Sequence, residues 1–335
     1  MDAVPAKILR LLEKQQLKPG ALAHKLGISR QALHRHLRSL VEAKRIQKHG
    51  AGPHVVYSVA SNGAGPTRVK EDYALCRRQF LQRYQNEFAG LLERYVQRPR
   101  KQGAASKKSA LDFGFLLDAA AVYSSNIEGN TLDLNSFLNS RMSPRKHRPK
   151  EAQEIEDLVS AYAYARKNNL DEKNMLHAHN ILSRQFVAKS RQGIYRREPV
   201  GVFSRHGLEY MAVEPHFVGQ EMHALFKVIS ELLRAKHTPA ERFFWAAWLH
   251  LTFALIHPFS DGNGRTARLC EKWFLFATLG EQSFSIPSEE QYWNNRSRYY
   301  AALKLGVNYW ETDMSTAFQF FVLLPQSLTG VLGKD

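Results

Sequence analysis

Apolar residues recur at helical spacing through residues 5–43 and give way to strand-like alternation afterwards. Gly27 begins a tight turn inside the helical stretch, and Ser29 can cap the helix that follows. Residues 45–48 and 55–59 then alternate as the two strands of a hairpin do. The pattern predicts three helices and a β-hairpin, which is the order of elements in a winged helix-turn-helix module.

A second helical region makes up most of the chain. Residues 60–67 have the composition of a linker, and a long helix is expected from about residue 69 to residue 96. Helical spacing continues over residues 111–324, interrupted by one strand-turn-strand pattern at residues 200–213. The predicted fold class is therefore mainly α. We divide the chain into a winged helix-turn-helix at 1–60, a linker at 61–67, a connecting helix and mobile segment at 68–110, a second, larger domain at 111–325 and a tail at 326–335.

The chain is strongly basic, and the excess is unevenly distributed. It carries 47 lysines and arginines against 31 acidic residues, a formal net charge of +16. Residues 1–60 hold 11 of the basic residues and three of the acidic ones. A basic balance favours anionic partners such as nucleic acid, nucleotides or acidic protein surfaces, although it also serves solubility alone.

Cysteine content and hydropathy indicate the compartment. The chain has only two cysteines, and its first residues show no secretory signal pattern, so we expect a cytoplasmic protein without disulfides. The most apolar run, residues 243–256, is too short to span a bilayer and contains His250. We therefore expect a buried helix there and no membrane partner.

The third helix of the N-terminal module has a basic polar face. In helix-turn-helix docking, the first residues of the second helix of the motif reach base edges in the major groove, and nearby cations neutralise phosphates. The residues placed for such contacts are Arg30, Gln31, Arg35, Arg38 and Lys48. The segment resembles winged helix-turn-helix domains of bacterial regulators, which implies double-stranded DNA as a partner. A solvated helix face and a protein–protein contact are the alternatives that the sequence leaves open.

A glycine-rich loop lies between two predicted helices in the second half of the chain. Thr238, Pro239 and Glu241 form a capping box at the start of the first helix. This helix ends at His257, because the residue before a proline is pushed out of the α conformation. The loop is expected over residues 259–264, with the second helix starting after it.

The loop combines groups that bind phosphate. Gly262 and Gly264 let the backbone approach an anion closely, in front of the positive end of a helix. Arg265 and Arg268 lie three residues apart in the first turn, where cations oppose the helix dipole. That unfavourable placement is explained if a polyphosphate sits in front of them.

Two further groups suggest chemistry at the same place. Asp261 can hold Mg²⁺ through oxygen, and a neutral His257 can take a proton from a hydroxyl near pH 7. Residues 262–267 also fit the Gly-x-Gly-x-x-Ala dinucleotide pattern, but that motif follows a strand, and a capped helix precedes it here. A structural histidine with surface arginines does not account for so many functional groups within one short stretch.

The stretch from His257 to Arg268 matches the Fic family motif His-x-Phe-x-[Asp/Glu]-Gly-Asn-Gly-Arg-x-x-Arg at every defined position. The chain thus resembles Fic protein adenylyltransferases over about residues 111–324. The resemblance implies a Fic helical bundle with a β-hairpin flap, transfer of AMP from ATP to a Ser, Thr or Tyr hydroxyl of a target protein, and Mg²⁺ as cofactor. It assigns His257 as general base, Asp261 as metal ligand and Phe259 as the anchor of the loop.

The resemblance also implies a set of nucleotide-binding positions. Residues 193–196 lead into the flap, which would dock an extended target segment by adding a strand. The implied ATP-binding residues include two, Tyr299 and Asn308, that would line the adenine pocket. The whole set is Arg197, Glu198, Pro199, Val200, Asp261, Gly262, Asn263, Gly264, Arg265, Thr266, Ala267, Arg268, Tyr299 and Asn308.

Ser124, Glu128 and Gly129 match the inhibitory motif of the same family, [Ser/Thr]-x-x-x-Glu-[Gly/Asn]. Ser124 and Glu128 share one helix face, and Gly129 ends the helix. A carboxylate there could pair with Arg268 and repel the charge of ATP. Because this motif precedes the catalytic one, the chain resembles the Fic class with an N-terminal inhibitory helix. In some relatives this glutamate also supports removal of AMP, and the sequence leaves both roles open.

Several alternatives remain at this point. The chain could be a DNA-binding transcriptional regulator whose Fic domain senses nucleotide. It could also be a Fic enzyme that transfers UMP, a phosphate or phosphocholine, because the loop binds phosphates and does not select the base. The target protein, the signal that relieves inhibition and the formation of a homodimer are all left open by the sequence.

Overall fold

The protein is described by a computed structural model covering residues 4–14, 17–43, 45–49, 55–59, 67–98, 107–142, 149–204 and 207–329. These residues fall into two compact units, Met1–Glu71 and Asp72–Asp335, and each is described by itself. The expected linker, mobile segment and tail fall largely on residues 60–66, 99–106 and 330–335, which lie outside the described residues.

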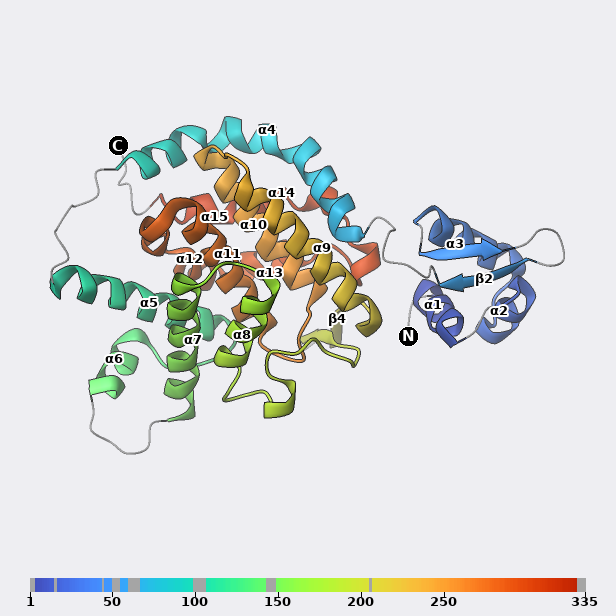
Figure 1. Ribbon diagram of the computed structural model, residues 1–335, viewed down its shortest axis with the longest axis horizontal. Coiled ribbons are helices and arrows are strands. Elements are labelled where there is room, and N and C mark those ends of the chain that lie inside the picture. The colour runs from blue at the N-terminus through green and yellow to red at the C-terminus, as the bar shows by residue number, and fades with distance from the viewer. Residues whose placement is uncertain are drawn as a thin grey trace. The chain divides into compact units, whose positions relative to one another are not determined.

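The N-terminal unit contains three helices and a two-stranded antiparallel hairpin, as expected (Figure 1). Ser29 caps the third helix by accepting a hydrogen bond from the Ala32 amide at 3.2 Å. Leu33, Leu37 and Leu40 of that helix are buried, so the basic residues between them lie on its exposed face. The elements are α1 Val4–Lys14, α2 Pro19–Leu26, α3 Arg30–Glu42, β1 Ile46–His49 and β2 Val56–Val59.

The second unit is helical apart from one hairpin, which confirms the predicted fold class (Figure 1). Its helices and strands are α4 Arg68–Gln97, α5 Lys107–Ile127, α6 Leu134–Met142, α7 Lys150–Lys167, α8 Glu172–Leu182, β3 Gly201–Ser204, β4 Gly207–Met211, α9 Pro215–Arg234, α10 Pro239–Ile256, α11 Asn263–Leu279, α12 Ser288–Asn294, α13 Arg296–Leu303, α14 Phe318–Phe321 and α15 Leu323–Gln326. Short 3₁₀ turns connect some of them, at Lys189–Arg191, Gly280–Ser285, Tyr309–Glu311 and Met314–Thr316.

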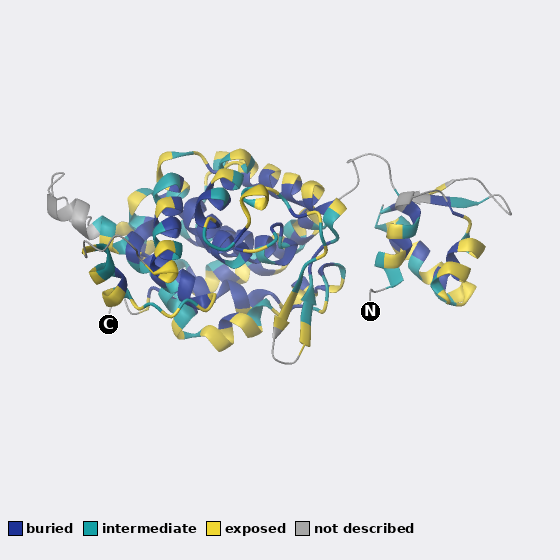
Figure 2. Cartoon of the chain, turned by 90° about the horizontal axis from the view of Figure 1, so that it is seen from below, coloured by how far each residue is buried: buried dark blue, intermediate teal, exposed yellow. Residues whose placement is uncertain are grey.

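Helix α10 forms the centre of this unit. It is apolar on every side and is buried along nearly its whole length, as a helix without a polar face must be (Figure 2). It packs against α11, and α4 covers it through aromatic pairs such as Tyr84 with Phe244 and Tyr73 with Trp245. Helix α5 packs against α7 and α12, and α7 packs against α8 and α11. Within the described residues, no helix has the length and hydrophobicity needed to cross a membrane.

The hairpin β3–β4 stands out from the bundle. Its strands are antiparallel, with an irregularity in register between Val202 and Phe203. Phe203 is 71% exposed and Leu208 is 47% exposed, so the hairpin carries apolar side chains in contact with solvent (Figure 2). Met211 at the end of β4 forms a parallel bridge with Asn308, which ties the base of the hairpin to the C-terminal part of the unit.

One boundary near the catalytic loop differs from the prediction. Helix α11 begins at Asn263, two residues before Arg265, where the sequence pattern placed its start. The reason is local, because Gly262 turns the chain at a φ of 81° and the Asn263 side chain bonds back to Phe259. Gly264 is consequently part of the first helical turn and not of the loop.

Candidate active site

His257 ends α10 in a left-handed conformation, with φ of 54° and ψ of 58°. Its Nδ1 lies 3.2 Å from the Ala254 carbonyl oxygen, which can only accept, so Nδ1 carries the proton and Nε2 of the neutral ring has the free lone pair. Burial lowers the pKa of His257 below its ordinary value of 6.5, and the bond to Ala254 opposes this only in part. The ring is therefore neutral at neutral pH, as a general base must be.

The loop after His257 is held by two side chains. Phe259 is fully buried, as expected of a loop anchor. The Asn263 carboxamide accepts a hydrogen bond from the Phe259 amide at 2.8 Å and donates one to the Phe259 carbonyl at 2.9 Å. These two bonds tie the Asn263 side chain to the loop and use one of the two N–H donors of its Nδ2.

His179 of α8 supports the same loop and was not identified from the sequence. Its ring stacks on Phe259 with centroids 3.6 Å apart. The Gly193 amide donates to Nδ1 at 2.9 Å, so Nε2 holds the proton and donates to the Asp261 carbonyl at 3.0 Å. Burial lowers the pKa of His179 to about 4, which keeps this tautomer neutral. A histidine inside an amphipathic helix gives no sequence signal for such a role.

The N-terminus of α11 lacks a side-chain cap. Gly262 occupies the N-cap position and has no side chain, while Thr266 donates its hydroxyl to the Gly262 carbonyl at 2.8 Å. The first amides of a helix have no partner within it and are available to an anion. Asp261 beside them is exposed and accepts from the Gly262 amide at 2.6 Å. Ala267 is fully buried behind this turn.

Arg265 is buried without a full set of acceptors. Only 8% of it is exposed, and its Nε and Nη1 make no hydrogen bond within the described chain. The guanidinium lies 3.9 Å above the Phe186 ring, and Nη1 is 3.7 Å from a Glu154 carboxylate oxygen. Burial lowers the pKa of Arg265. Buried polar groups are normally satisfied, so these donors indicate a site for an additional acceptor.

Arg268 is held by the segment that carries the predicted inhibitory motif, Ser124 to Gly129. Glu128 Oε1 lies 2.7 Å from its Nη2, and Ser124 accepts from its Nε at 2.8 Å. The Arg268 side chain is 1% exposed and that of Glu128 is 29% exposed. Burial raises the pKa of the Glu128 carboxyl, but the ion pair with Arg268 outweighs this effect and the pKa falls below 4.5. Gly129, at a φ of 98°, turns the chain after Glu128.

Glu128 also occupies space in front of α11. A Cβ on Gly264 would overlap the Glu128 Oε1 atom, so the carboxylate rests directly against the backbone of the first helical turn. An anionic side chain therefore already fills part of the space that the helix N-terminus offers to an anion.

Tyr299 points its hydroxyl into this network. It is 2% exposed and accepts a hydrogen bond from Arg268 Nη1 at 3.2 Å. His250 Nε2 lies 3.0 Å from the same hydroxyl, and His250 Nδ1 lies 2.8 Å from Glu271. Tyr299 thus links Arg268 to the buried hydrogen bonds of His250 and Glu271. The prediction that Tyr299 lines the adenine pocket did not suggest this link.

The remaining predicted nucleotide residues lie around the flap. Arg197 and Pro199 are exposed, and the Val200 carbonyl accepts from the Ala212 amide at 3.1 Å at the base of the hairpin. Asn308 accepts from the Trp310 and Glu311 amides, both at 3.1 Å, so its side chain caps a turn beside β4.

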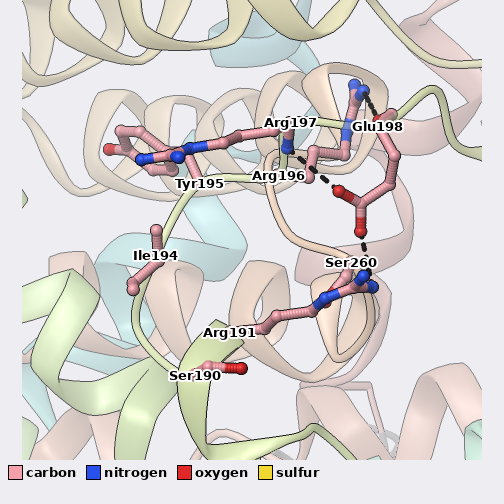
Figure 3. A pocket seen from close by; sticks show the side chains of 8 residues that line it. All are labelled: Ser190, Arg191, Ile194, Tyr195, Arg196, Arg197, Glu198 and Ser260. Atoms are coloured by element: carbon pink, nitrogen blue, oxygen red, sulfur yellow. Dashed lines mark hydrogen bonds and ion pairs between the residues drawn. The ribbon is translucent and has the colours of Figure 1, made fainter.

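A cavity of about 330 Å³ opens between the segment before the flap and the catalytic loop (Figure 3). Arg191 and Glu198 form an ion pair of 2.8 Å at its edge, beside Ser260. Glu198 also accepts from the Arg197 amide at 3.2 Å. The lining residues are Ser190, Arg191, Ile194, Tyr195, Arg196, Arg197, Glu198 and Ser260.

The residues predicted to contact DNA all lie in the N-terminal unit and are exposed. They are Arg30, Gln31, Arg35, Arg38 and Lys48. Arg38 forms an ion pair of 2.8 Å with Glu42 on the same helix, and both side chains are mostly exposed.

Comparison with known proteins agrees with this geometry. Residues 169–275 match the family model described as the Fic/DOC family. The chain carries a Fic/DOC domain. Residues 6–44 match the model of the arsR family of bacterial regulatory proteins, so an ArsR-type helix-turn-helix precedes the Fic domain. These matches confirm the domain types that the two sequence motifs implied.

Relatives of the Fic region are distant. A protein adenylyltransferase Fic from Drosophila persimilis is 30% identical over 189 residues, which make up 55% of this chain and 35% of that protein. A Fido domain-containing protein from Dictyostelium discoideum is 27% identical over 135 residues, 40% of this chain and 85% of the relative. The match thus spans about a third of the length of the adenylyltransferase.

A solved structure supports the fold. The crystal structure of a Fic family protein from Desulfovibrio desulfuricans aligns with a TM-score of 0.60 and 22% identity, covering 75% of this chain and 74% of that one. At this identity the likeness concerns the fold alone.

Proposed function

We propose that the protein transfers AMP from ATP to a Ser, Thr or Tyr hydroxyl of a target protein and is held in check by Glu128. The observation that carries the proposal is the uncapped, buried start of α11. There, the helix N-terminus and the unsatisfied donors of Arg265 follow the loop that begins at the neutral imidazole of His257, and Arg265 and His257 both interact electrostatically with Glu128. An anion acceptor and a base in one place are what nucleotidyl transfer requires.

The proposed reaction uses these groups in order. His257 Nε2 takes the proton of the target hydroxyl, whose oxygen attacks the α-phosphorus of ATP. The bond to the bridging oxygen breaks and pyrophosphate leaves, so the new phosphodiester links AMP to the target. The amides at the start of α11 and the two arginines of its first turns would stabilise the charge on the phosphates, since such transfers depend mainly on positioning and electrostatics.

Asp261 fits the role of magnesium ligand. Mg²⁺ bound with a nucleotide takes most of its ligands from phosphates and water and needs only one or two protein carboxylates. Asp261 is a single exposed carboxylate next to the anion-binding turn, and no cluster of three or more ligating side chains occurs among the described residues. Magnesium held there would neutralise charge on the phosphates when ATP is bound.

Glu128 supplies the inhibition in this proposal. It pairs with Arg268, one of the residues that the Fic resemblance assigns to ATP binding, and it rests against Gly264. ATP would have to bind without that arginine and close to a carboxylate of its own sign. The wild-type protein should therefore be a slow enzyme, and removal of the carboxylate should release it.

The flap suits the docking of an extended target segment. Within the described residues, only β4 pairs with β3, so the outer edge of β3 has unpaired backbone groups. Phe203 on β3 and its cross-strand partner Leu208 on β4 add exposed apolar surface to the hairpin. A target segment that adds to β3 as a strand could gain affinity from main-chain hydrogen bonds and specificity from contacts with these apolar side chains.

The test is labelling with ATP radioactive at the α-phosphate. The Glu128→Gly protein should label itself or proteins of a cell lysate much faster than wild type, and Glu128→Gly with His257→Ala should not label at all. The Glu128→Gln variant is the matched control, because it keeps the size of the side chain and removes its charge. No label on any protein with Glu128→Gly would disprove the proposal, and competition among nucleoside triphosphates would reveal transfer of UMP or another group.

A second role for Glu128 can be tested on the modified target. If the carboxylate also supports removal of AMP, wild-type protein should release label from a target that was modified by the Glu128→Gly protein. Label that stays in place over the same period would limit Glu128 to inhibition.

DNA binding is a second proposed function, favoured by the exposed basic face of α3 in the ArsR-type module. Arg30, Gln31 and Arg35 would lie near base edges, and Arg38 and Lys48 near phosphates. Enrichment of genomic fragments by the full chain should identify a preferred sequence, and Arg35→Ala should abolish that preference. Binding that is equal for all fragments and disappears with salt would refute a regulatory role.

A further inference from the structure

The conformation of His257 is unusual and needs support. Among the described residues, it is the only one other than glycine with a positive φ. A left-handed conformation is strained for a residue with a Cβ and persists only where the surrounding structure holds it. The groups that hold His257 therefore decide where the base lies.

Arg196 is the group that contacts the backbone of His257. Its Nε donates to the His257 carbonyl at 2.7 Å and its Nη2 to the Ile256 carbonyl at 3.3 Å. Its own amide donates to the Pro258 carbonyl at 2.9 Å. One residue therefore binds three consecutive carbonyls across the end of α10, on both sides of the strained residue.

The same guanidinium also binds both sides of the flap. Nη1 donates to the Glu198 carbonyl at 3.0 Å, just before β3, and Nη2 donates to the Val213 carbonyl, just after β4. Tyr210 of β4 adds a bond of 2.8 Å from its hydroxyl to the Leu255 carbonyl in the last turn of α10. Figure 3 shows Arg196 on the segment that leads to Glu198, beside the catalytic loop at Ser260.

Charge makes this arrangement favourable. Arg196 is 4% exposed, and burial lowers its pKa to about 10, so it stays charged at neutral pH. The carbonyls at the end of a helix carry partial negative charge and lack partners within the helix. A planar guanidinium with five donors can satisfy several of them at once, whereas an ammonium group cannot reach them in the same plane.

We propose that Arg196 is a positioning residue that holds the base and the flap in one fixed relation. The flap would present the target hydroxyl and His257 would take its proton, so Arg196, with the Tyr210 hydroxyl beside it, would set the distance between them. The inference rests on the proposed transfer reaction, but its structural part, control of the His257 conformation, is measurable without any transfer.

The experiment compares Arg196→Met and Arg196→Lys, each in the Glu128→Gly background. Arg166→Met is the matched control, because its guanidinium pairs with Glu281 and packs on Phe113 instead. Transfer, ATP affinity by calorimetry and the titration of His257 by NMR of ¹³C-labelled histidine are measured for each. His257→Ala identifies the resonance.

Arg196→Met should lower kcat by roughly 100-fold, since a misplacement of about 1 Å costs this much, while the Kd of ATP changes less than about threefold. The pKa of His257 should rise, because the positive charge of Arg196, which disfavours the protonated ring, is lost. Arg196→Lys should restore the pKa of His257 but only part of kcat. Lysine keeps the positive charge but lacks the planar set of N–H donors of a guanidinium. Arg166→Met should change none of these values.

An unchanged His257 titration and an unchanged kcat in Arg196→Met would overturn the inference. Equal losses of ATP affinity and kcat, together with a lower melting temperature, would do so too, because they indicate a purely structural role. If Arg196→Met does not fold, Arg196→Lys carries the test through kcat and ATP affinity. If the Glu128→Gly parent shows no transfer, the proposed function fails, and an unchanged His257 titration in Arg196→Met would still overturn the contact between Arg196 and His257.

Discussion

The N-termini of α10 and α11 belong to the same unit, but side chains cap the first and not the second. Helix α10 begins with a complete capping box, in which Thr238 accepts from the Glu241 amide at 3.3 Å and Glu241 accepts from the Thr238 amide at 2.8 Å. Helix α11 begins at a glycine without a side-chain cap, and its first turn carries Arg265 where α10 carries an acidic residue. The N-terminus of α10 is stabilised by its own side chains. The N-terminus of α11 has neither a side-chain cap nor an acidic residue in its first turn.

The N-terminus of α11 is therefore less stabilised by its own residues than that of α10. A glycine at the N-cap gives up on the order of a few tenths of a kcal/mol relative to a Ser or Thr cap, and a cation near a helix N-terminus opposes the dipole by roughly 0.3–1 kcal/mol. Such a cost is offset when an anionic ligand takes the place of the cap. The comparison therefore separates a helix end that serves the fold from one that the proposed function assigns to binding, and substitutions at the two ends should affect different measurements.

The largest effect is expected from closing the space in front of α11. Gly264→Ala in the Glu128→Gly background places a methyl group where the phosphates are proposed to bind, so ATP affinity should fall by roughly 100-fold through overpacking. Gly219→Ala in α9 is the control, because a Cβ there meets no atom within 4 Å. Calorimetry gives both affinities. Normal ATP binding by Gly264→Ala would place the nucleotide elsewhere.

Removal of the unsatisfied cation comes next. Arg265→Met keeps the stacking volume over Phe186 and removes donors that have no acceptor in the described chain. ATP affinity should drop roughly 10-fold or more, the worth of a charge-assisted hydrogen bond, while the melting temperature stays the same or rises. Calorimetry and thermal unfolding on one sample test this. A large loss of stability with full ATP affinity would contradict a binding role.

The pH dependence should separate the base from the inhibitory pair. The pKa of His257 lies below 6.5, and Glu128 raises it, so Glu128→Gly lowers it further. Because the base must be neutral, kcat of Glu128→Gly should fall only as pH drops below 6.5, by about tenfold per unit.

Wild type should remain inhibited across the same pH range. The pKa of Glu128 lies below 4.5, and a carboxylate with a lowered pKa keeps its ion pair at every pH above that value. Rate profiles between pH 5 and 8 for the two proteins test both statements. A midpoint above 6.5, or activation of wild type near pH 6, would refute the assignment.

The smallest effect is expected at the capped end. Thr238→Ala removes one half of the capping box of α10 and should lower the free energy of unfolding by about 1 kcal/mol. ATP affinity and kcat should not change, because this end only serves the fold. Chemical denaturation measures the free energy of unfolding, and calorimetry measures the ATP affinity. A change in ATP affinity comparable to that of Arg265→Met would remove the distinction between the two helix ends.

Local sequence signals predicted local structure well. Ser29 before α3, the capping box before α10 and the Pro258 that follows His257 each act within one helical turn, so their effect is visible in a short stretch of sequence. The start of α11 was placed two residues late, because the bond from Asn263 back to Phe259 is a detail of three-dimensional geometry.

The sequence by itself determined the helical fold class, the helix-turn-helix module, the hairpin and the Fic/DOC domain type, since these depend on spacing and residue type. Only the tertiary structure decided which groups support them. Arg196 reaches the carbonyls of residues 256, 257 and 213, and His179 reaches the carbonyl of residue 261, across long separations in the chain. The physical reason is that backbone carbonyls carry no residue identity, so a side chain that binds them leaves no pattern in the sequence.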